Sequence, residues 1–214
     1  MTYLDAVNNV LTRLRENTVL SVIDNAYSKL IGRFVNDAKT QVEIVYPWNC
    51  LQSDIVISTV VGTSNYTATG SGQNFRVLEV INDTTNTSIT LKPLSEIKKL
   101  QRTTPSSGTP QYYAFNGVTA SGDAKVEFYP TPDAVESIVF VSVIPTSDLN
   151  VDTDLIYVPN QPVILGAWAR AVAERGEDQG MSSSEIYGLY KDSLSDAIAI
   201  ESSRTAEDAS WSSI

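Results

Sequence analysis

The sequence predicts an α+β protein in which helices from the N- and C-terminal ends form a bundle, with an inserted antiparallel β-sandwich or barrel-like domain. Apolar residues recur with a helical period up to Val45, the period changes to two from about Leu51 to Asn150, and the helical period returns after Leu155. Each amphipathic helix needs a partner for its apolar stripe, so the two ends are expected to pack together. We therefore expect a helical bundle from residues 1–50 and 151–205, a β domain over 51–150, and a C-terminal tail over 206–214.

Two helices are expected in the N-terminal part. The first covers residues 3–16 and follows Thr2, a typical N-cap residue. The second runs from about Asp24 to Val45, with Pro47 stopping it. Gly32 inside this helix is either a mild defect or a point where two helices approach closely. Its apolar face ends at Val45, and four charged side chains are expected largely away from that face: Lys29, Arg33, Asp37 and Lys39.

The central segment predicts short strands separated by turn formers such as Gly, Asn-Asp and Pro. This density of strands is typical of a compact antiparallel sandwich or barrel. Leu94–Leu100 is the exception and predicts a helical turn or two after Pro93. The expected strands are Asp54–Val61, Asn65–Thr69, Phe75–Ile81, Ser88–Lys92, Gln111–Phe115, Ala124–Tyr129 and Ile138–Ile144.

Two further helices are expected in the C-terminal part. Asn160, with Pro162 at an early helical position, predicts a helix through about Arg175. Ser182 or Ser183 begins a last helix that extends to about Arg204. The side chains expected on its inner face are Ile186, Leu189, Tyr190, Leu194, Ala197 and Ile198.

Composition excludes several classes of function. The 214 residues include no His and one Cys, which excludes Ser-His-Asp and Cys-His catalysis, His-ligated zinc or haem, and an intrachain disulfide. We expect neither an enzyme nor a bound cofactor. No apolar run approaches the length of a membrane span and the start lacks a secretory signal, so the expectation is a soluble intracellular protein with no membrane contact.

The net charge of −10 is concentrated in the last third of the chain. Residues 151–214 carry four basic and eleven acidic side chains. Because no basic stripe is present to neutralise phosphates, tight binding of nucleic acid is not expected. An acidic wall past which DNA slides without sticking remains compatible with this charge.

The candidate catalytic and metal sites are weak. Three acidic pairs lie in polar stretches, where a solvated loop explains them better than catalysis: Asp152 with Asp154, Glu177 with Asp178, and Glu207 with Asp208. Asp152 and Asp154 resemble the start of a calcium loop, but the Gly and Glu that complete one are missing. Cys50 is expected to be a small buried side chain.

The three tryptophans differ in their surroundings. Trp48 and Trp168 are expected to anchor the core. Trp211 lies in a polar tail that ends at Ile214, so it is either disordered or docked on another chain.

One stretch carries a family resemblance. Residues 107–114, Ser-Gly-Thr-Pro-Gln-Tyr-Tyr-Ala, are followed by a turn at Gly117 and by residues 126–133, Val-Glu-Phe-Tyr-Pro-Thr-Pro-Asp. This pattern resembles that of the head-to-tail adaptor proteins of tailed bacteriophages, the tail tubular protein A type included. The order of the surrounding helices is also similar, and the resemblance covers roughly residues 1–200.

The resemblance implies a structural virion protein that is made in the cytoplasm of the host and located in the neck or tail of the virion. Such adaptors form a ring, twelve copies in this family, between the portal protein and a tail nozzle or tail tube protein, and the ring lines the channel through which double-stranded DNA is ejected. The family's C-terminal extension against the portal would correspond to residues 206–214, with Trp211 and Ile214 as docking residues. A ring of twelve chains would carry a charge of about −120 and repel DNA. The side chains expected at the lumen or surface are Glu174, Glu177, Asp178 and Glu185.

Two alternatives belong to other classes of function. A carbohydrate-binding β-sandwich on a helical stalk would use aromatic side chains near turns: Tyr66, Tyr112, Tyr113 and Phe115. Aromatic residues in strands more often belong to the core. A small hydrolase is disfavoured by the missing His and by the lack of a nucleophile motif.

Overall fold

The computed structural model describes residues 1–176 and 182–204, and it divides the chain into two compact units. A helical unit combines Met1–Cys50 with the segment that begins at Thr146, and a β unit comprises Leu51–Pro145. The chain re-enters the helical unit at Thr146, earlier than the boundary expected at residue 151. Among the described residues, no helix is both long and apolar enough to cross a lipid bilayer.

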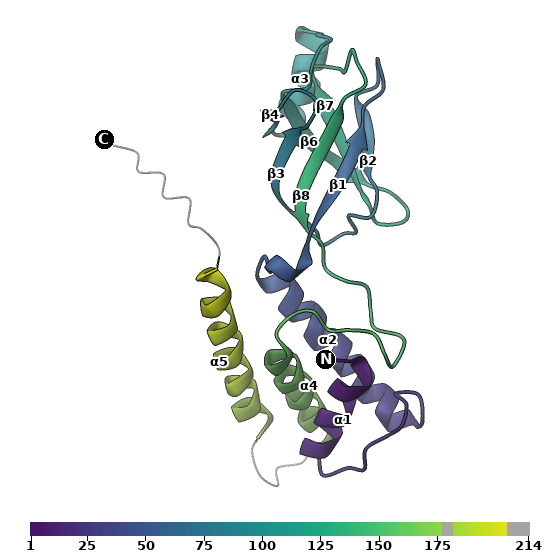
Figure 1. The fold of residues 1–214 in the computed structure, drawn as a ribbon, viewed down its shortest axis with the longest axis vertical. Helices are drawn as coiled ribbons and strands as arrows, with labels where there is room; N and C mark the ends of the chain where they lie inside the picture. Colours follow the sequence, from purple (N-terminus) through teal and green to yellow (C-terminus); the bar gives the residue numbers. More distant parts are fainter. Residues whose placement is uncertain (177–181, 205–214) are drawn as a thin grey trace, which may run out of the picture. The chain divides into compact units, whose positions relative to one another are not determined.

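The helical unit contains four α-helices whose starts are fixed by local capping. Thr2, Asn25 and Ser182 each accept a hydrogen bond from the backbone N–H three residues later, and that later side chain bonds back to the N-cap. Gly176, with a φ of 63°, ends the third of these helices in the left-handed region that glycine adopts readily. The helices are α1 (Tyr3–Arg13), α2 (Ala26–Val45), α4 (Asn160–Arg175) and α5 (Ser183–Ser202) (Figure 1).

The contacts between these helices centre on α4. It packs against α1, α2 and α5, and α1 also packs against α2. Gly166 of α4 lies close to side chains of both α2 and α5, because a Cβ there would be 3.2 Å from Ala38 of α2 and 3.3 Å from Tyr190 of α5. Small residues on α4 therefore allow its two neighbours to approach closely.

The segment that follows the β unit is bound along α2. Asn36 of α2 exchanges two hydrogen bonds with the backbone of Leu149, at 3.0 and 2.8 Å. Lys39, expected to point away from the apolar face, is instead fully buried. Its Nζ donates to the carbonyl oxygens of Thr146 and Ser147 and lies 3.2 Å from the Glu43 carboxylate. The expectation for Lys39 was wrong because its partners come from a segment more than a hundred residues away.

Three apolar residues differ from expectation in the opposite direction. Leu189, expected on the inner face of α5, is 42% exposed, and Val45 at the end of α2 is exposed as well. Trp168 is half-buried, with the Arg13 guanidinium 5.3 Å from its ring, whereas Trp48 is buried as expected. Among the described residues α5 packs mainly on α4, which leaves much of its remaining surface uncovered.

The hydroxyl of Tyr190 provides a test of the packing between α4 and α5. Tyr190 is buried, burial raises its pKa, and its hydroxyl has no hydrogen-bond partner among the residues that the structure describes. Because a buried unpaired hydroxyl costs about 1–3 kcal/mol, Tyr190→Phe should leave the protein equally stable or up to about 1 kcal/mol more stable. Urea unfolding followed by circular dichroism measures this, with Tyr187→Phe on the exposed side of α5 as control. A loss of more than about 1 kcal/mol would contradict the burial of an unpaired hydroxyl.

The β unit contains eight strands in two four-stranded sheets and one helix. The first sheet has the order β1-β8-β3-β4 and the second has the order β2-β7-β6-β5. A short 3-10 helix (Asn49–Leu51) precedes β1, and α3 (Leu94–Thr103), longer than the expected turn or two, packs against β6 and β7. The strands are β1 (Gln52–Ser58), β2 (Asn65–Ala68), β3 (Arg76–Asn82), β4 (Thr87–Ser88), β5 (Thr90–Leu91), β6 (Tyr112–Val118), β7 (Ala124–Tyr129) and β8 (Ser137–Val143).

The α+β class is confirmed, but two details of the β prediction were wrong. The two sheets do not close into a barrel, and β5 pairs with β6 in parallel, so the second sheet is mixed. The single strand expected over Ser88–Lys92 is split at Ile89, whose neighbours on either side belong to different sheets. Ile89 is buried among the residues of the core between the sheets, so the chain changes sheet where that side chain enters the core.

Candidate interaction surfaces

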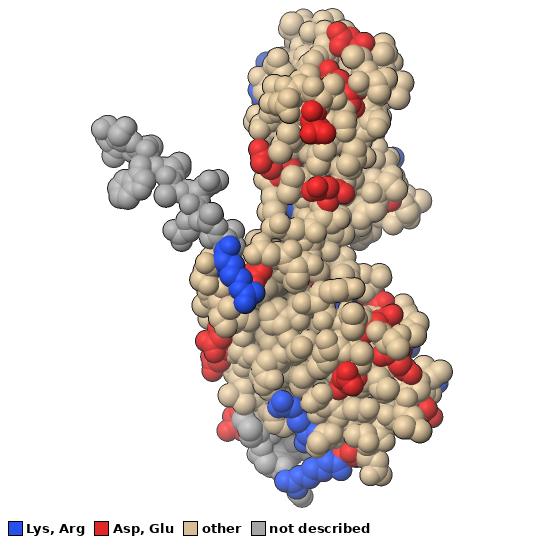
Figure 2. Space-filling view, in the orientation of Figure 1, with Lys and Arg blue, Asp and Glu red and all other residues tan. Residues whose placement is uncertain are grey.

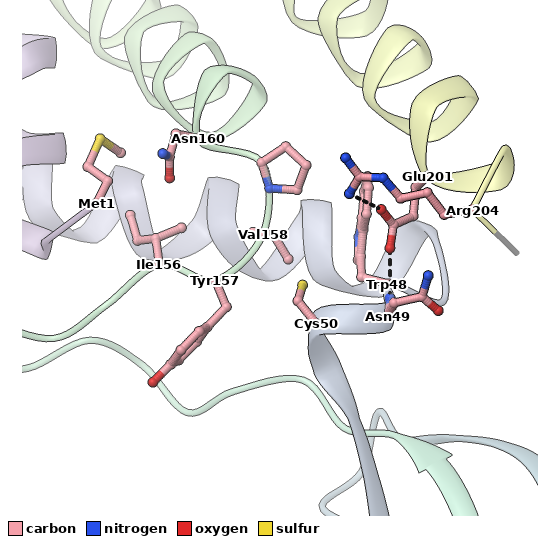
Figure 3. A pocket seen from close by; sticks show the side chains of 11 residues that line it. Met1, Trp48, Asn49, Cys50, Ile156, Tyr157, Val158, Asn160, Glu201 and Arg204 are labelled. Carbon is pink, nitrogen blue, oxygen red and sulfur yellow. Dashed lines mark hydrogen bonds and ion pairs between the residues drawn. The ribbon is translucent and has the colours of Figure 1, made fainter.

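A pocket of about 500 Å³ lies in the helical unit at the C-terminal end of α5 (Figure 3). Glu201 and Arg204 contribute from the end of that helix, and the segment before α4 forms the opposite wall. Arg204, one of the residues that line the pocket, is the last residue of the chain that the structure describes. The lining residues are Met1, Trp48, Asn49, Cys50, Ile156, Tyr157, Val158, Pro159, Asn160, Glu201 and Arg204.

The pocket is built on Trp48 and Glu201. The Trp48 indole is buried and its Nε1 donates a 2.7 Å hydrogen bond to the carbonyl of Val42, which caps the end of α2. One carboxylate oxygen of Glu201 accepts from the Asn49 backbone N–H at 3.0 Å, and the other lies 3.4 Å from Arg204. These bonds, two of them drawn in Figure 3, fix the last turn of α5 to the residues that follow α2.

Cys50 lies in this pocket and corrects an expectation. It is exposed rather than buried. Partial burial of the thiol and then the nearby Glu201 carboxylate raise the pKa of Cys50, which keeps it protonated and poorly nucleophilic at neutral pH. The pocket thus has a lining that is more polar than apolar, and its carboxylate, Glu201, is already engaged by Asn49 and Arg204.

The structure describes only part of the charged cluster expected between α4 and α5. Glu174 lies exposed in the last turn of α4, and Glu185 lies exposed in the first turn of α5, where it completes the cap with Ser182. Glu177 and Asp178 fall outside the described residues. The expected docking residues Trp211 and Ile214 also fall outside them, as do Glu207 and Asp208.

Asp152 and Asp154, which resembled the start of a calcium loop, accept hydrogen bonds from backbone N–H groups. Asp152 accepts a 2.9 Å hydrogen bond from the Val22 N–H, which attaches its segment to the loop before α2. Asp154 accepts from the N–H groups of Val151 and Asn150, and these bonds lower its pKa. In residues 1–176 and 182–204, no group of three or more possible metal ligands comes together.

The aromatic residues considered for carbohydrate binding lie mostly in the core. Tyr113 is 5% exposed and meets Phe140 edge-on, with ring centroids 5.5 Å apart. The half-buried Tyr66 donates its hydroxyl to backbone carbonyls in the loop that follows β1. Tyr112 is half-buried beneath Lys92, and Phe115 is 37% exposed. These four side chains do not form an exposed aromatic platform.

The sequence motif that carried the family resemblance forms the β6–β7 hairpin and its two flanks. Pro110 is buried just before β6, and Gly117, with a φ of 88°, lies at an irregularity within that strand. The hairpin turns later than expected, at residues 119–123, where the Thr119 N–H donates to the Asp123 carbonyl at 2.8 Å. The two flanks are bonded together because the Gly108 N–H donates to the Thr131 carbonyl at 2.9 Å. Both halves of the motif are therefore adjacent parts of one element.

A charged contact fixes α3 over this hairpin. Glu127 of β7 is fully buried, and its carboxylate accepts from Lys98 of α3 at 2.7 Å and from Asn116 of β6 at 3.1 Å. The sequence analysis gave Glu127 no role beyond its place in the motif. A charged residue among apolar neighbours in a strand is the signal that could have indicated a buried ion pair.

Comparison with known proteins identifies the family. The whole chain, residues 1–213, matches the SU10 adaptor protein family, and no curated protein matches it significantly. The chain belongs to the SU10 adaptor protein family. The predicted relationship to phage adaptors is thereby confirmed. Membership implies a structural component of a bacteriophage particle that contacts portal and tail proteins.

Exposed apolar side chains lie at two places in the helical unit that were not predicted from the sequence. Leu20 and Ile23, in the loop between α1 and α2, are 93% and 67% exposed. Ile200 on α5 is 57% exposed, on the same helix as the unexpectedly exposed Leu189. Leu20 and Ile23 could have been recognised in the sequence as large apolar residues within a polar turn between two helices.

Proposed function

We propose that this protein is the head-to-tail adaptor of its phage, forming a ring of twelve copies between the portal and the tail nozzle or tail tube. The observation that carries the proposal is the match to the SU10 adaptor protein family over residues 1–213. The ring would line the DNA channel without enzymatic activity. In this proposal α1, α2, α4 and α5 act as one helical bundle, since α4 contacts the other three, and the β unit is the inserted domain.

Charge supports a passive role towards DNA. The chain has a net charge of −10, and the described lumen candidates Glu174 and Glu185 are exposed. An acidic channel wall repels phosphates, so double-stranded DNA would pass without specific binding. Glu177 and Asp178 would add to this charge if the segment between α4 and α5 faces the channel.

We further propose that residues 206–214 dock on the portal, with Trp211 and Ile214 as apolar anchors. The pocket at the end of α5 supports this role, since the last described residue, Arg204, lies on its rim. The bonds of Glu201 to Asn49 and Arg204 fix the point from which the tail departs. A tail that starts from a fixed point searches a smaller volume for its binding site.

The test is the mass of the assembly formed with the portal protein of the same phage. Light scattering should show about twelve copies of the adaptor captured per portal ring. Trp211→Ala combined with Ile214→Ala should weaken capture by about tenfold or more, since buried aromatic anchors each contribute on the order of 2 kcal/mol. Ser212→Ala with Ser213→Ala is the matched control and should bind as the unmodified protein does.

The contrary results separate the alternatives. A protein that remains monomeric, is not captured by the portal and is retained on a glycan array would replace the adaptor role with carbohydrate binding. Capture of about twelve copies that is insensitive to the Trp211 and Ile214 changes would keep the adaptor role and remove the role of the tail.

A further inference from the structure

The loop between α1 and α2 holds two large apolar side chains in solvent on a fixed backbone. Leu20 and Ile23 are 93% and 67% exposed, while Val22 between them is buried. The Asp24 carboxylate accepts from the N–H groups of Leu20 and Ser21 at 2.8 and 2.9 Å. A loop constrained in this way presents its exposed side chains without a further loss of conformational entropy on binding.

Other elements of the helical unit hold the same loop. Asn8 of α1 exchanges two hydrogen bonds with the backbone of Val19, at 3.0 and 2.8 Å. Asp152 accepts from the Val22 N–H, and the Ser28 hydroxyl of α2 donates to the Val22 carbonyl at 2.8 Å. The loop is therefore hydrogen-bonded to α1, α2 and the segment before α4. These bonds fix the backbone that exposes Leu20 and Ile23.

Two cations lie next to this loop, on the first turns of α2. Lys29 and Arg33 are four residues apart, so their Cβ atoms lie about 6 Å from each other on one face of the helix. Both side chains are exposed, and neither forms an ion pair within residues 1–176 and 182–204. Asp37, one turn further on, limits the basic area to the start of α2. We call Leu20, Ile23, Lys29 and Arg33 the basic patch.

The outward side of α5 carries a complementary set. Leu189, Asp192, Asp196 and Ile200 are spaced three, four and four residues apart, which places them on one stripe of the helix, and all four are exposed. The two apolar residues lie about 17 Å apart at the ends, with the two carboxylates between them. In the described part of the chain, neither Asp192 nor Asp196 forms an ion pair. We call these four residues the acidic stripe.

The two surfaces match in charge and spacing but cannot meet within one chain. Asp192 and Asp196 have the same four-residue spacing as Lys29 and Arg33, and each surface includes two exposed apolar side chains. α5 is packed on α4, on the side of the helical unit away from the α1–α2 loop (Figure 1). Figure 2 shows acidic side chains along the outer edge of α5 in the same orientation.

We propose that the acidic stripe of one copy binds the basic patch of the next copy. The occupant of each surface is thus a second copy of this chain, selected by charge complementarity and by the apolar side chains that flank the charges. A contact between two different surfaces is heterologous, and repetition of it around an axis closes a ring. This inference rests on the proposed ring and names the contact that would form it.

Charge reversal on each side, followed by a swap, tests the contact. Asp192→Lys with Asp196→Lys makes both surfaces basic, and Lys29→Glu with Arg33→Glu makes both acidic. Each double variant should lower self-association, measured by sedimentation at low salt and by copies captured per portal ring, about tenfold or more. The fourfold variant, and an equimolar mixture of the two double variants, should restore association to within about threefold, because every contact again pairs opposite charges.

Two controls separate a lost contact from a lost fold. Asp54→Lys with Asp133→Lys makes the same change of charge on exposed positions of the β unit and should leave association unchanged. All variants should keep the circular dichroism spectrum and melting temperature of the unmodified protein, since exposed substitutions usually alter stability by less than about 0.5 kcal/mol.

Covalent capture gives an independent readout. In a Cys50→Ser background, a chain carrying both Ile23→Cys and Leu189→Cys should form a ladder of disulfide-linked multimers on mild oxidation. A chain with either cysteine alone should form no ladder beyond a dimer, because a heterologous contact needs one cysteine from each surface.

The outcomes distinguish this contact from the proposed function. If the unmodified protein assembles on the portal in multiple copies but charge reversal has no effect and no ladder forms, the contact is wrong and the ring stands. Reversal that reduces association without rescue by the swap also overturns the contact, and points to another partner for the reversed surface. If the unmodified protein assembles neither alone nor with the portal, both the ring and this contact are overturned.

Discussion

Replacing Lys39 with methionine is expected to lower the free energy of unfolding by about 3–5 kcal/mol. The Lys39 ammonium and the Glu43 carboxylate are both fully buried and lie 3.2 Å apart. Methionine has a similar length and no charge, so the substitution leaves Glu43 buried without its cation. It also removes the donor to the carbonyls of Thr146 and Ser147, where the chain re-enters the helical unit.

A double-mutant cycle separates the ion pair from the packing of the side chains. Glu43→Gln removes the negative charge and keeps one of the two acceptor oxygens, to which the Thr146 N–H and hydroxyl bond separately at 3.1 and 2.7 Å. The double variant with Lys39→Met should be more stable than Lys39→Met alone, because no uncompensated charge then remains buried. Equal stability of the two would show that Lys39 acts only through its carbonyl partners.

Urea unfolding followed by circular dichroism at 222 nm is the measurement, at a protein concentration where no self-association occurs. Lys29→Met changes an exposed lysine of the same helix and should alter stability by less than about 0.5 kcal/mol. A loss below about 1 kcal/mol for Lys39→Met would contradict the burial of this pair.

Replacing Gly32 with alanine is expected to destabilise the protein by about 1–3 kcal/mol, although alanine is normally preferred to glycine inside a helix. A Cβ at this position would overlap the Tyr3 hydroxyl of α1 and lie 2.8 Å from Val22 Cγ1 in the loop before α2. Both neighbours are buried, so neither can move aside without disturbing the core. The close approach of α1 and α2 therefore explains this glycine.

The matched control is Gly188→Ala in α5, where a Cβ would meet nothing within 4 Å. That substitution should stabilise the protein by about 0.5–1 kcal/mol, the ordinary helical preference for alanine. Tyr3→Phe removes the nearest atom and should recover part of the loss in the Gly32→Ala background. Thermal unfolding of the three variants and of the unmodified protein measures these differences. If Gly32→Ala is as stabilising as Gly188→Ala, the close contact with Tyr3 is wrong.

The exposed apolar residues of the helical unit are the surface that the proposed contact between copies would bury. Leu20 and Ile23 on the α1–α2 loop, with Leu189 and Ile200 on α5, would be a liability in a protein that remains alone. In a protein that contacts copies of itself they are the part of the surface that assembly buries. The charges beside them, Asp192 with Asp196 and Lys29 with Arg33, would set the direction of the contact.

The sequence by itself determined where most of the elements lie. Thr2, Asn25 and Ser182 are N-cap residues with their capping partners three positions on, and Gly176 adopts the left-handed conformation that ends α4. These signals depend on residues within one turn, which the sequence displays directly. The residue pattern over 107–133 also indicated the adaptor family. In the structure this motif forms a single hairpin with bonded flanks.

Only the tertiary structure decided which residues are buried. Lys39 is four residues after Val35 and three before Val42 on the apolar side of α2, and its charge can be buried there because Thr146, Ser147 and Glu43 supply three acceptors for its ammonium group. Leu189 fits the apolar side of α5 and is exposed because α4 covers only part of that helix. The expected strand at Ser88–Lys92 splits at Ile89, because that side chain enters the core between two sheets. In each case the burial of a side chain depends on partners distant in the chain, and the spacing of apolar residues within one element does not show where those partners lie.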